Sequence, residues 1–382
     1  MSDWGEVTLR EVTVNFDAQR VPVRAADRKP GPYPYYGASG VVDHVSDYLF
    51  DGEYLLVAED GENLRTRKTP IAFMASGRFW VNNHAHILRG THRANARYLC
   101  YALAEVDVSG YLSGSTQPKL TQAALNSIRL SIPRRDEQDQ VVELLGALDD
   151  KIAVNERIAV TALDLAESRY RAAAEANSWR AVTLGRAGRW LSGGTPKTSE
   201  PSYWGGGIPW ISALSLKSPW IDDSDRKLTD LGSVSGTRLV PAETIIFVVR
   251  GSSLKSEFRI GITQCEVAFG QDCKALIPDG SIDPYLLFYA VRSSTSEIME
   301  MVDETSIGAG RLSTDLISKL EVRVPEMRDD STAAQVRMLS ALAAGRQRES
   351  RTLATLRDTL LPQLMSGKLR VRDAEKIVED AV

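Results

Sequence analysis

Two long stretches of the chain carry a helical pattern of apolar residues. Residues 136–176 contain no proline, and their apolar positions recur at intervals of three and four residues. This spacing is typical of the seam of a coiled coil. The seam positions that we assign in this stretch are Leu145, Leu148, Ile152, Asn155, Ala159, Ala162 and Ala166.

The second stretch, 330–361, repeats the pattern. Pro362 should end this helix, because proline lacks an N–H and clashes with the preceding turn. Each helix needs a partner for its apolar stripe, so we expect the two helices to lie antiparallel and bury each other's seams. Asn155 either fixes the register of the pair or caps a local irregularity. The second seam consists of Leu339, Leu342, Leu353, Leu356 and Leu360.

The rest of the chain has the pattern of short strands. Runs rich in β-branched and aromatic residues predict strands, and they include EYLLVAE (53–59), IRLSIP (128–133) and TIIFVVR (244–250). Clusters of glycine and proline predict turn-rich loops between strands, as in KPGPYPYYG (29–37), SGGTPKT (192–198) and YWGGGIPW (203–210).

The two halves of the chain also resemble each other. WGEVTL at 4–9 matches WRAVTL at 179–184, and LLVAEDG at 55–61 matches IIFVVRG at 245–251. Further on, 114–133 matches 306–325, so that Lys119 corresponds to Arg311. The shift between matching positions grows in one step, and one insertion of roughly fifteen residues in a surface loop accounts for that step. The pattern therefore indicates a duplicated domain.

The sequence thus predicts an α+β protein with a pseudo-two-fold internal repeat. Two similar mixed α/β domains are separated by two long antiparallel helices that form a coiled coil. The expected boundaries are 1–135 for the first domain, 136–177 for the first long helix, 178–327 for the second domain, and 328–382 for the second helix and the C-terminal tail.

Composition narrows the possible functions. The 382 residues have a net charge of −4, which is not the excess of Lys and Arg usual in nucleic-acid-binding proteins. A whole-chain sum can nevertheless hide a basic face. Three cysteines without CxxC spacing argue against structural zinc and a disulfide framework. Without a signal peptide or a membrane-spanning apolar run, the chain is expected to be cytoplasmic.

Several motifs together resemble one known family. They are the segments 34–61 and 114–133, the loop pattern GGTP…YWGG.IPW within 192–212, and the tail LLPQLMSGKLRV at 360–371. With these motifs the chain resembles, over essentially its whole length, the specificity subunit of type I restriction–modification enzymes. The resemblance implies two target-recognition domains, each reading one half of a bipartite double-stranded DNA sequence. It also implies helices that set the gap and dock two methyltransferase subunits, with restriction (motor–nuclease) subunits joining for cleavage.

Motifs of catalysis are missing from the sequence. The chain has no Pro-Pro dipeptide for an adenine-methyltransferase loop and no phosphate-binding loop of the GxxxxGK[ST] type. We therefore expect a chain that binds DNA and does not catalyse. By the resemblance, S-adenosylmethionine, ATP and Mg would belong to partner subunits. His84 and His86 would share one face of a strand, but the second copy has Asp272 and Lys274 there, which favours structural histidines over a metal site.

The loops offer side chains that can contact bases and phosphates. Lys119 and Arg311 occupy matching places, which indicates a common phosphate contact; alternatively each caps a turn or stays in water. Tyr35, Tyr36 and Trp210 are alternatively packing anchors beside Pro and Gly. The full set of DNA-contact candidates is Tyr35, Tyr36, Ser39, Arg78, Thr116, Gln117, Lys119, Lys197, Thr198, Trp210, Ser212, Arg250, Ser252, Ser253 and Arg311.

Two other classes of protein compete with a DNA-reading subunit. One is a structural adaptor whose two spaced domains bind protein only; its loops should then show apolar patches. The other is part of a fused restriction or modification enzyme, which should carry a cofactor-binding motif. Neither feature is evident in the sequence, and the target sequence and gap length cannot be deduced from it.

Overall fold

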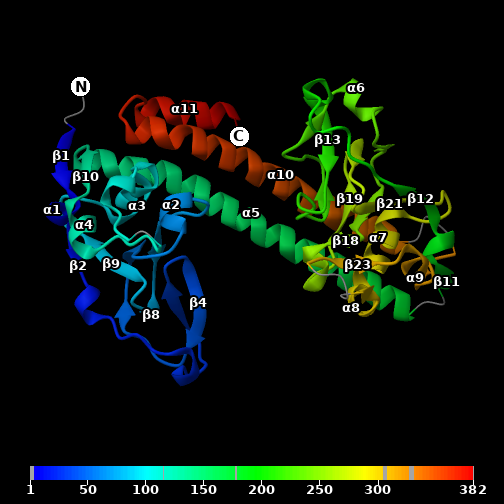
Figure 1. The fold of residues 1–382 in the computed structure, drawn as a ribbon, viewed down its shortest axis with the longest axis horizontal. Coiled ribbons are helices and arrows are strands. Elements are labelled where there is room, and N and C mark those ends of the chain that lie inside the picture. Colours follow the sequence, from blue (N-terminus) through cyan, green and yellow to red (C-terminus); the bar gives the residue numbers. More distant parts are fainter. Residues whose placement is uncertain (1–3, 115, 177–178, 304–307, 327–330, 382) are drawn as a thin grey trace. The chain divides into compact units, whose positions relative to one another are not determined.

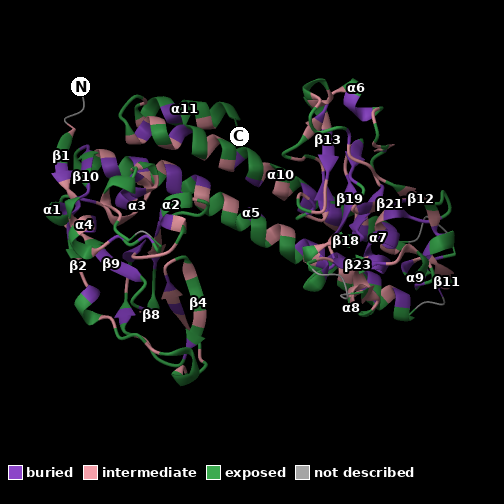
Figure 2. Ribbon diagram, in the orientation of Figure 1, coloured by how far each residue is buried: buried purple, intermediate pink, exposed green. Residues whose placement is uncertain are grey.

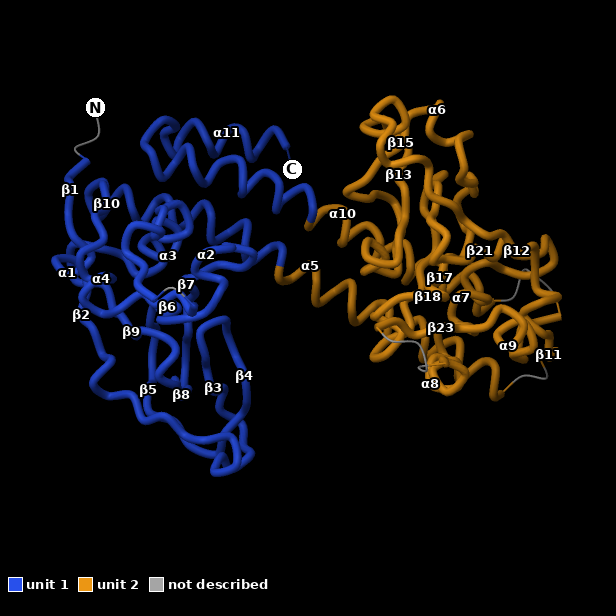
Figure 3. Tube along the Cα trace, in the orientation of Figure 1, with its two compact units in different colours: residues 1–152, 351–382 blue, residues 153–350 orange. Residues whose placement is uncertain are grey.

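A computed structural model describes residues 4–114, 116–176, 179–303, 308–326 and 331–381 (Figure 1). The predicted boundaries at 177/178 and 327/328 lie outside the described residues. The chain divides into two compact units, one of residues 1–152 and 351–382 and one of residues 153–350 (Figure 3). Each unit contains one mixed α/β domain and part of each long helix, so the α+β class is confirmed.

The two long helices are α5 (Arg135–Ala176) and α10 (Ser331–Met365). In the first unit, leucines from the start of α5 and the end of α10 share one apolar cluster: Leu145, Leu148, Leu353 and Leu360. In the second unit, small residues from the end of α5 and the start of α10 share another: Ala162, Ala166, Ala333 and Val336. The helices therefore pack antiparallel within each unit, as the apolar pattern predicts.

Two details of the helix prediction are wrong. Leu342 is 42 % exposed, because the buried face of α10 passes through Ser340 and Ala343 instead. The Tyr289 hydroxyl lies 3.1 Å from Ser340 Oγ, so a large domain side chain fills the space beside a small helix residue. Pro362 lies inside α10, which continues to Met365, so the proline does not end the helix where the sequence predicts. Of the other predicted seam residues, Asn155 is buried, and Ile152, Leu339 and Leu356 are half-buried.

The last residues of the chain turn back after α10. Gly367 has φ +67°, and a Cβ there would lie 2.9 Å from Cε2 of Trp4. Glycine therefore both permits this turn and makes room for the indole. A further helix, α11 (Val371–Ala381), follows. No helix in the described part of the chain is both long and apolar enough to span a membrane.

The first domain comprises two four-stranded sheets and a terminal strand pair. Its strands are β1 (Gly5–Thr8), β2 (Thr13–Asn15), β3 (Tyr33–Gly37), β4 (Gly40–Val45), β5 (Phe50–Asp51), β6 (Tyr54–Ala58), β7 (Ala72–Ala75), β8 (Arg78–Val81), β9 (Ala85–Gly90) and β10 (Arg129–Ile132), and its helices are α1 (Leu9–Val12), α2 (Asn63–Thr66), α3 (Ala96–Glu105) and α4 (Gln122–Ser127). The sheet orders are β2-β9-β6-β7 and β4-β3-β8-β5, and β1 pairs with β10.

The second domain uses the same plan with additional strands. Its strands are β11 (Arg180–Thr183), β12 (Gly188–Ser192), β13 (Trp204–Ile211), β14 (Trp220–Ile221), β15 (Lys227–Leu228), β16 (Leu239–Val240), β17 (Ile245–Val248), β18 (Arg250–Gly251), β19 (Ile260–Thr263), β20 (Val267–Phe269), β21 (Cys273–Pro278), β22 (Val302–Asp303), β23 (Gly310–Leu312) and β24 (Glu321–Val324), and its helices are α6 (Asp230–Ser233), α7 (Pro284–Ser293), α8 (Thr295–Glu300) and α9 (Thr314–Ile317). The sheet orders include β12-β21-β17-β19-β14 and β15-β13-β20-β16, and β11 pairs with β24.

The strand orders of the two domains match position by position. In the first domain β3 and β8 run parallel with Tyr35 opposite Trp80, and in the second β13 and β20 run parallel with Trp210 opposite Ala268. The central strands β6 and β17 are buried along their whole length (Figure 2). Buried apolar strands therefore set the frame in both domains, which confirms the internal repeat.

Candidate nucleic-acid interface

Lys119 and Arg311 occupy equivalent places in the two domains. Lys119 forms an isolated bridge with Asp60, and Arg311 of β23 lies opposite Arg250 of β18. Each is followed by a Leu and then by a hydroxyl residue that begins a short helix, α4 or α9. The structure therefore brings two separate sequence matches into contact in both domains. Lys119 thus lies between Asp60 and Ser113, whereas Arg311 lies between Arg250 and Asp303.

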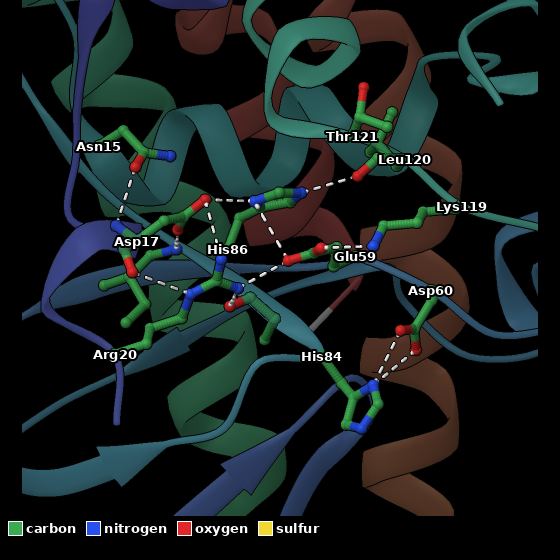
Figure 4. Close-up of polar contacts among 12 residues, drawn as sticks. Asn15, Asp17, Arg20, Glu59, Asp60, His84, His86, Lys119, Leu120 and Thr121 are labelled. Carbon is green, nitrogen blue, oxygen red and sulfur yellow. Dashed lines mark hydrogen bonds and ion pairs between the residues drawn. The ribbon is translucent and has the colours of Figure 1, made fainter. Parts of the chain in front are cut away.

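Lys119 is tied to an internal charge network in the first domain (Figure 4). Its Nζ lies 3.1 Å from Glu59 Oε1, and its side chain is 50 % exposed. Glu59 also accepts a hydrogen bond from Arg20 at 2.7 Å. Burial alone would raise the pKa of Glu59, but hydrogen bonds from Arg20 and Lys119 lower it overall. The charge of Lys119 is therefore partly compensated by a carboxylate of its own domain.

The network continues to a buried histidine. His86 Nδ1 lies 2.5 Å from Asp17 Oδ2, and Nε2 lies 2.7 Å from the carbonyl oxygen of Leu120. Burial would raise the pKa of Asp17, but its hydrogen bond and charge interaction with His86 lower it overall. The His86 ring therefore links Asp17 to the backbone next to Lys119.

The expectation that His84 and His86 share a strand face is wrong. His84 precedes β9, is exposed, and lies 2.8 Å from Asp60 Oδ2, whereas His86 lies within β9 and is buried (Figure 4). The two rings therefore have separate carboxylate partners. In the described ranges, no three His, Cys, Asp or Glu side chains are grouped so that they could hold a metal ion.

The aromatic candidates of the first domain serve its packing. Tyr35 is 1 % exposed, and its hydroxyl accepts a hydrogen bond from Val23 N at 3.0 Å. Tyr36 is half-buried between Phe73 and Phe79, and burial raises its pKa. Tyr35 is therefore a packing anchor, and its assignment to a DNA contact is corrected because its ring and hydroxyl are enclosed.

The remaining candidates of the first domain lie on exposed segments. Ser39 lies at the tip of the β3–β4 hairpin. Thr116 and Gln117 lie in the loop before Lys119. Arg78 is exposed but forms an ion pair with Asp51 at 3.2 Å. These side chains are accessible to a ligand, although the charge of Arg78, like that of Lys119, is partly compensated by a carboxylate of the same domain.

Five candidates of the second domain are grouped around β18 and β23. A Cβ on Gly251 would lie 3.7 Å from Ala213 Cβ and 3.8 Å from Ser253 Oγ, so the 212–215 turn meets the segment after β18. Arg250 and Arg311 are exposed in neighbouring strands. The group that the fold brings together consists of Ser212, Arg250, Ser252, Ser253 and Arg311.

A second group surrounds the two tryptophans of β13. Trp210 is 5 % exposed and donates from Nε1 to Gly194 O at 3.1 Å, so it is a packing anchor and its assignment to a DNA contact is corrected. Lys197 and Thr198 are exposed beside it. Arg226, which the sequence prediction missed, stacks on Trp204 with 3.7 Å between guanidinium carbon and ring centroid. Trp204 and Arg226 come together only through the pairing of β13 with β15, so no local sequence pattern predicts their contact.

Both domains share one plan of mixed sheets and a terminal strand pair. Residues 1–161, which form the first domain and the start of α5, match the model of the type I restriction modification DNA specificity domain.

Individual relatives agree with this match. The putative type I restriction enzyme specificity subunit S.HindORF215P of Haemophilus influenzae is 37% identical over 144 residues, covering 37% of this chain and 36% of that protein. The EcoR124I/EcoR124II specificity subunit of Escherichia coli is 28% identical over 156 residues, which cover 40% of this chain and 39% of that protein. These matches thus span less than half of either relative.

Longer matches are more distant. The MjaIX specificity subunit of Methanocaldococcus jannaschii is 24% identical over 349 residues, covering 84% of this chain and 80% of that protein. The crystal structure of a type I restriction-modification system S subunit from M. genitalium superposes with a TM-score of 0.69 at 16% identity, covering 95% of this chain and 96% of that chain. The chain therefore shares the fold of that subunit.

Proposed function

We propose that the chain is the sequence-specific DNA-recognition subunit of a type I restriction–modification complex. Each domain reads one half of a bipartite duplex target, and α5 and α10 set the gap between the halves. The observation that carries this proposal is the duplication of one backbone frame with different polar side chains at matching positions. The clearest example is a pair of opposite residues: Asp60 and Lys119 in the first domain correspond to Arg250 and Arg311 in the second. Two similar frames with different surface groups suit two different half-sites.

The proposed contact surface follows from exposure. Exposed hydroxyl, amide and cationic groups are suited to bases and phosphates, and the buried rings of Tyr35 and Trp210 are removed from the set. Because Tyr36 is half-buried, only the edge of its ring is accessible for a contact with DNA. The remaining exposed candidates are Ser39, Arg78, Thr116, Gln117, Lys119, Lys197, Thr198, Arg250, Ser252 and Arg311, and Ser212 and Ser253 are half-buried beside them.

Partners supply the chemistry in this proposal. Two methyltransferase subunits dock on the helical segments and bring S-adenosylmethionine, and restriction subunits bring ATP and Mg. The chain itself positions DNA without catalysing, in the cytoplasm. Its net charge of −4 supports weak DNA binding by the isolated chain, because non-specific affinity depends on cations.

Methylome mapping tests the proposal. The chain is co-expressed with its cognate methyltransferase subunits in a host without other methylation, and methylated bases are mapped by sequencing. We expect one bipartite motif with a fixed gap, which disappears when the gene is deleted. A Ser212→Ala/Ser252→Ala variant should relax only one half of the motif. Methylation that is unaffected by deletion, or a motif without two halves, would contradict the proposal.

A further inference from the structure

Arg226 has an ordered aromatic support in the second domain. Its guanidinium carbon lies 3.7 Å from the ring centroid of Trp204 and 4.9 Å from that of Trp210. The two indoles meet edge to face, with centroids 5.5 Å apart. A guanidinium stacked in this way keeps its plane fixed while its N–H edge stays available for hydrogen bonds.

The surrounding backbone holds the stack in place. Trp204 Nε1 donates to Lys197 O at 3.2 Å, and Trp210 Nε1 donates to Gly194 O at 3.1 Å. The backbone N–H of Trp210 donates to Arg226 O at 2.8 Å. Both rings and the arginine backbone are therefore fixed before any ligand arrives, so little side-chain entropy is lost on binding.

The stack borders an open hollow of about 350 Å³. Its lining residues are Trp204, Gly205, Gly206, Asp225, Arg226 and Lys227. A Cβ on Gly206 would lie 2.3 Å from Leu228 O, so the close approach of β13 to β15 requires glycine there. The glycines of the WGGG segment therefore shape the hollow that the arginine borders.

Arg226 differs in its charge partners from Arg28 and Arg78, two arginines of the first domain that also lie over aromatic rings. Arg28 lies over Tyr35 but forms an ion pair with Asp43 at 3.1 Å, and Arg78 forms one with Asp51 at 3.2 Å. Across the residues that the structure describes, no carboxylate forms an ion pair with Arg226. Its donors are therefore available to an external acceptor.

We propose that Arg226 reads one guanine in the half-site of the second domain; this inference rests on the proposed function. Arginine recognises guanine through two parallel hydrogen bonds to O6 and N7, which requires a planar, oriented guanidinium. Asp225 lines the same hollow, and Asp223 pairs with Lys227 at 2.9 Å. These carboxylates repel a phosphate but not the neutral edge of a base.

The experiment compares methylation motifs of complexes assembled with the wild-type chain, Arg226→Ala, Arg226→Lys and Arg238→Ala. Arg238 is an exposed cation of the same domain and serves as the matched control. Arg226→Ala should lose discrimination roughly ten- to a hundredfold at one guanine of one half-site. Arg226→Lys should relax the same position, because lysine keeps the charge but lacks the fork. Arg238→Ala should leave the motif unchanged.

The outcomes separate the inference from the proposed function. An unchanged motif with folded Arg226→Ala would overturn the inference while leaving the proposed function intact. Uniform weakening at all positions would make Arg226 a phosphate contact and would also overturn it. If Arg226→Ala does not fold, Arg226→Lys decides, and a full motif in that variant overturns the inference. A wild-type complex without any bipartite motif would overturn both.

Discussion

The two domains differ most where their strands match most closely. In the first, Asp17 follows β2 and His86 lies within β9, and a buried hydrogen bond of 2.5 Å joins their side chains. In the second, the matching strands β12 and β21 carry Ser192 and Lys274, which form a hydrogen bond at 2.6 Å and are exposed to solvent in part. The strand registers that hold both pairs are equivalent, with Asn15 opposite Leu88 and Trp190 opposite Leu276.

This difference shows that the strand order and register do not require the same polar pair in both domains. The shared apolar positions of β6 and β17 are buried in both domains, and burial of apolar area supplies most of the free energy that favours folding. Polar groups at the sheet margin are therefore free to change. In the first domain they form a network in which Glu59 pairs with Arg20 and Lys119, whereas in the second Ser192 and Lys274 form a single hydrogen bond.

The largest expected effect is on the stability of the first domain. Asp17→Ala removes the buried acceptor of both His86 Nδ1 and the Ile87 backbone N–H, so the free energy of unfolding should fall by about 2–5 kcal/mol. Hydrogen exchange at β6 and β9 amides would locate the loss in the first domain.

The second domain supplies the control for that prediction. Ser192→Ala removes the matching, partly exposed hydrogen bond to Lys274 and should cost about 1 kcal/mol or less. Equal losses for Asp17→Ala and Ser192→Ala would show that the two pairs contribute alike and would contradict the comparison.

The same contrast explains which features could be predicted from the sequence. The repeat and the long helices were predictable because apolar periodicity is a local signal. The pairing of Asp17 with His86 was not, because it joins positions far apart in the chain. Tyr35 and Trp210 were ambiguous, since a ring beside Pro and Gly either packs or contacts a ligand. Leu342 was misplaced because alanines and a serine on the true buried face give a weak apolar signal.

A smaller effect is expected at the long helices, which also repeat between the halves. Asn155 of α5 and Ser350 of α10 are both buried in the second unit, and within the described protein their side-chain polar atoms have no hydrogen-bond partner. Asn155→Leu should raise the free energy of unfolding by about 1–3 kcal/mol, because an unsatisfied buried amide is replaced by apolar surface. Chemical denaturation measures the change.

Ser350→Ala is the matched control for Asn155→Leu. It removes a single hydroxyl and should stabilise the chain by a smaller amount. A destabilised Asn155→Leu chain would show that the amide has a specific role in the seam, such as fixing the helix register.

DNA affinity should respond differently at Lys119 and Arg311. Glu59 already pairs with Lys119 at 3.1 Å, whereas Arg311 lies between Arg250 and Asp303 and forms no ion pair with a carboxylate of the described residues. Arg311→Ala should therefore weaken binding of the assembled complex roughly fivefold and lower the salt slope by about 0.9, as expected for one lost phosphate contact. Lys119→Ala should have a smaller effect on both. Affinity measured over a salt series checks the order, and a larger effect at Lys119 would contradict it.

The smallest expected effect is on the pH dependence that Asp17 gives to the first domain. Burial would raise the pKa values of Asp17 and Glu59, but hydrogen bonds from His86, Arg20 and Lys119 lower both pKa values overall in the folded chain. A lowered folded-state pKa contributes stability above the unfolded value, and this contribution is lost as the pH falls through the folded value. Wild-type stability should therefore fall below about pH 4 more steeply than that of Asp17→Asn, which has one fewer group to protonate. Parallel slopes in acid denaturation would show that Asp17 does not carry the stabilising charge, and the comparison between the domains would then rest on hydrogen bonding alone.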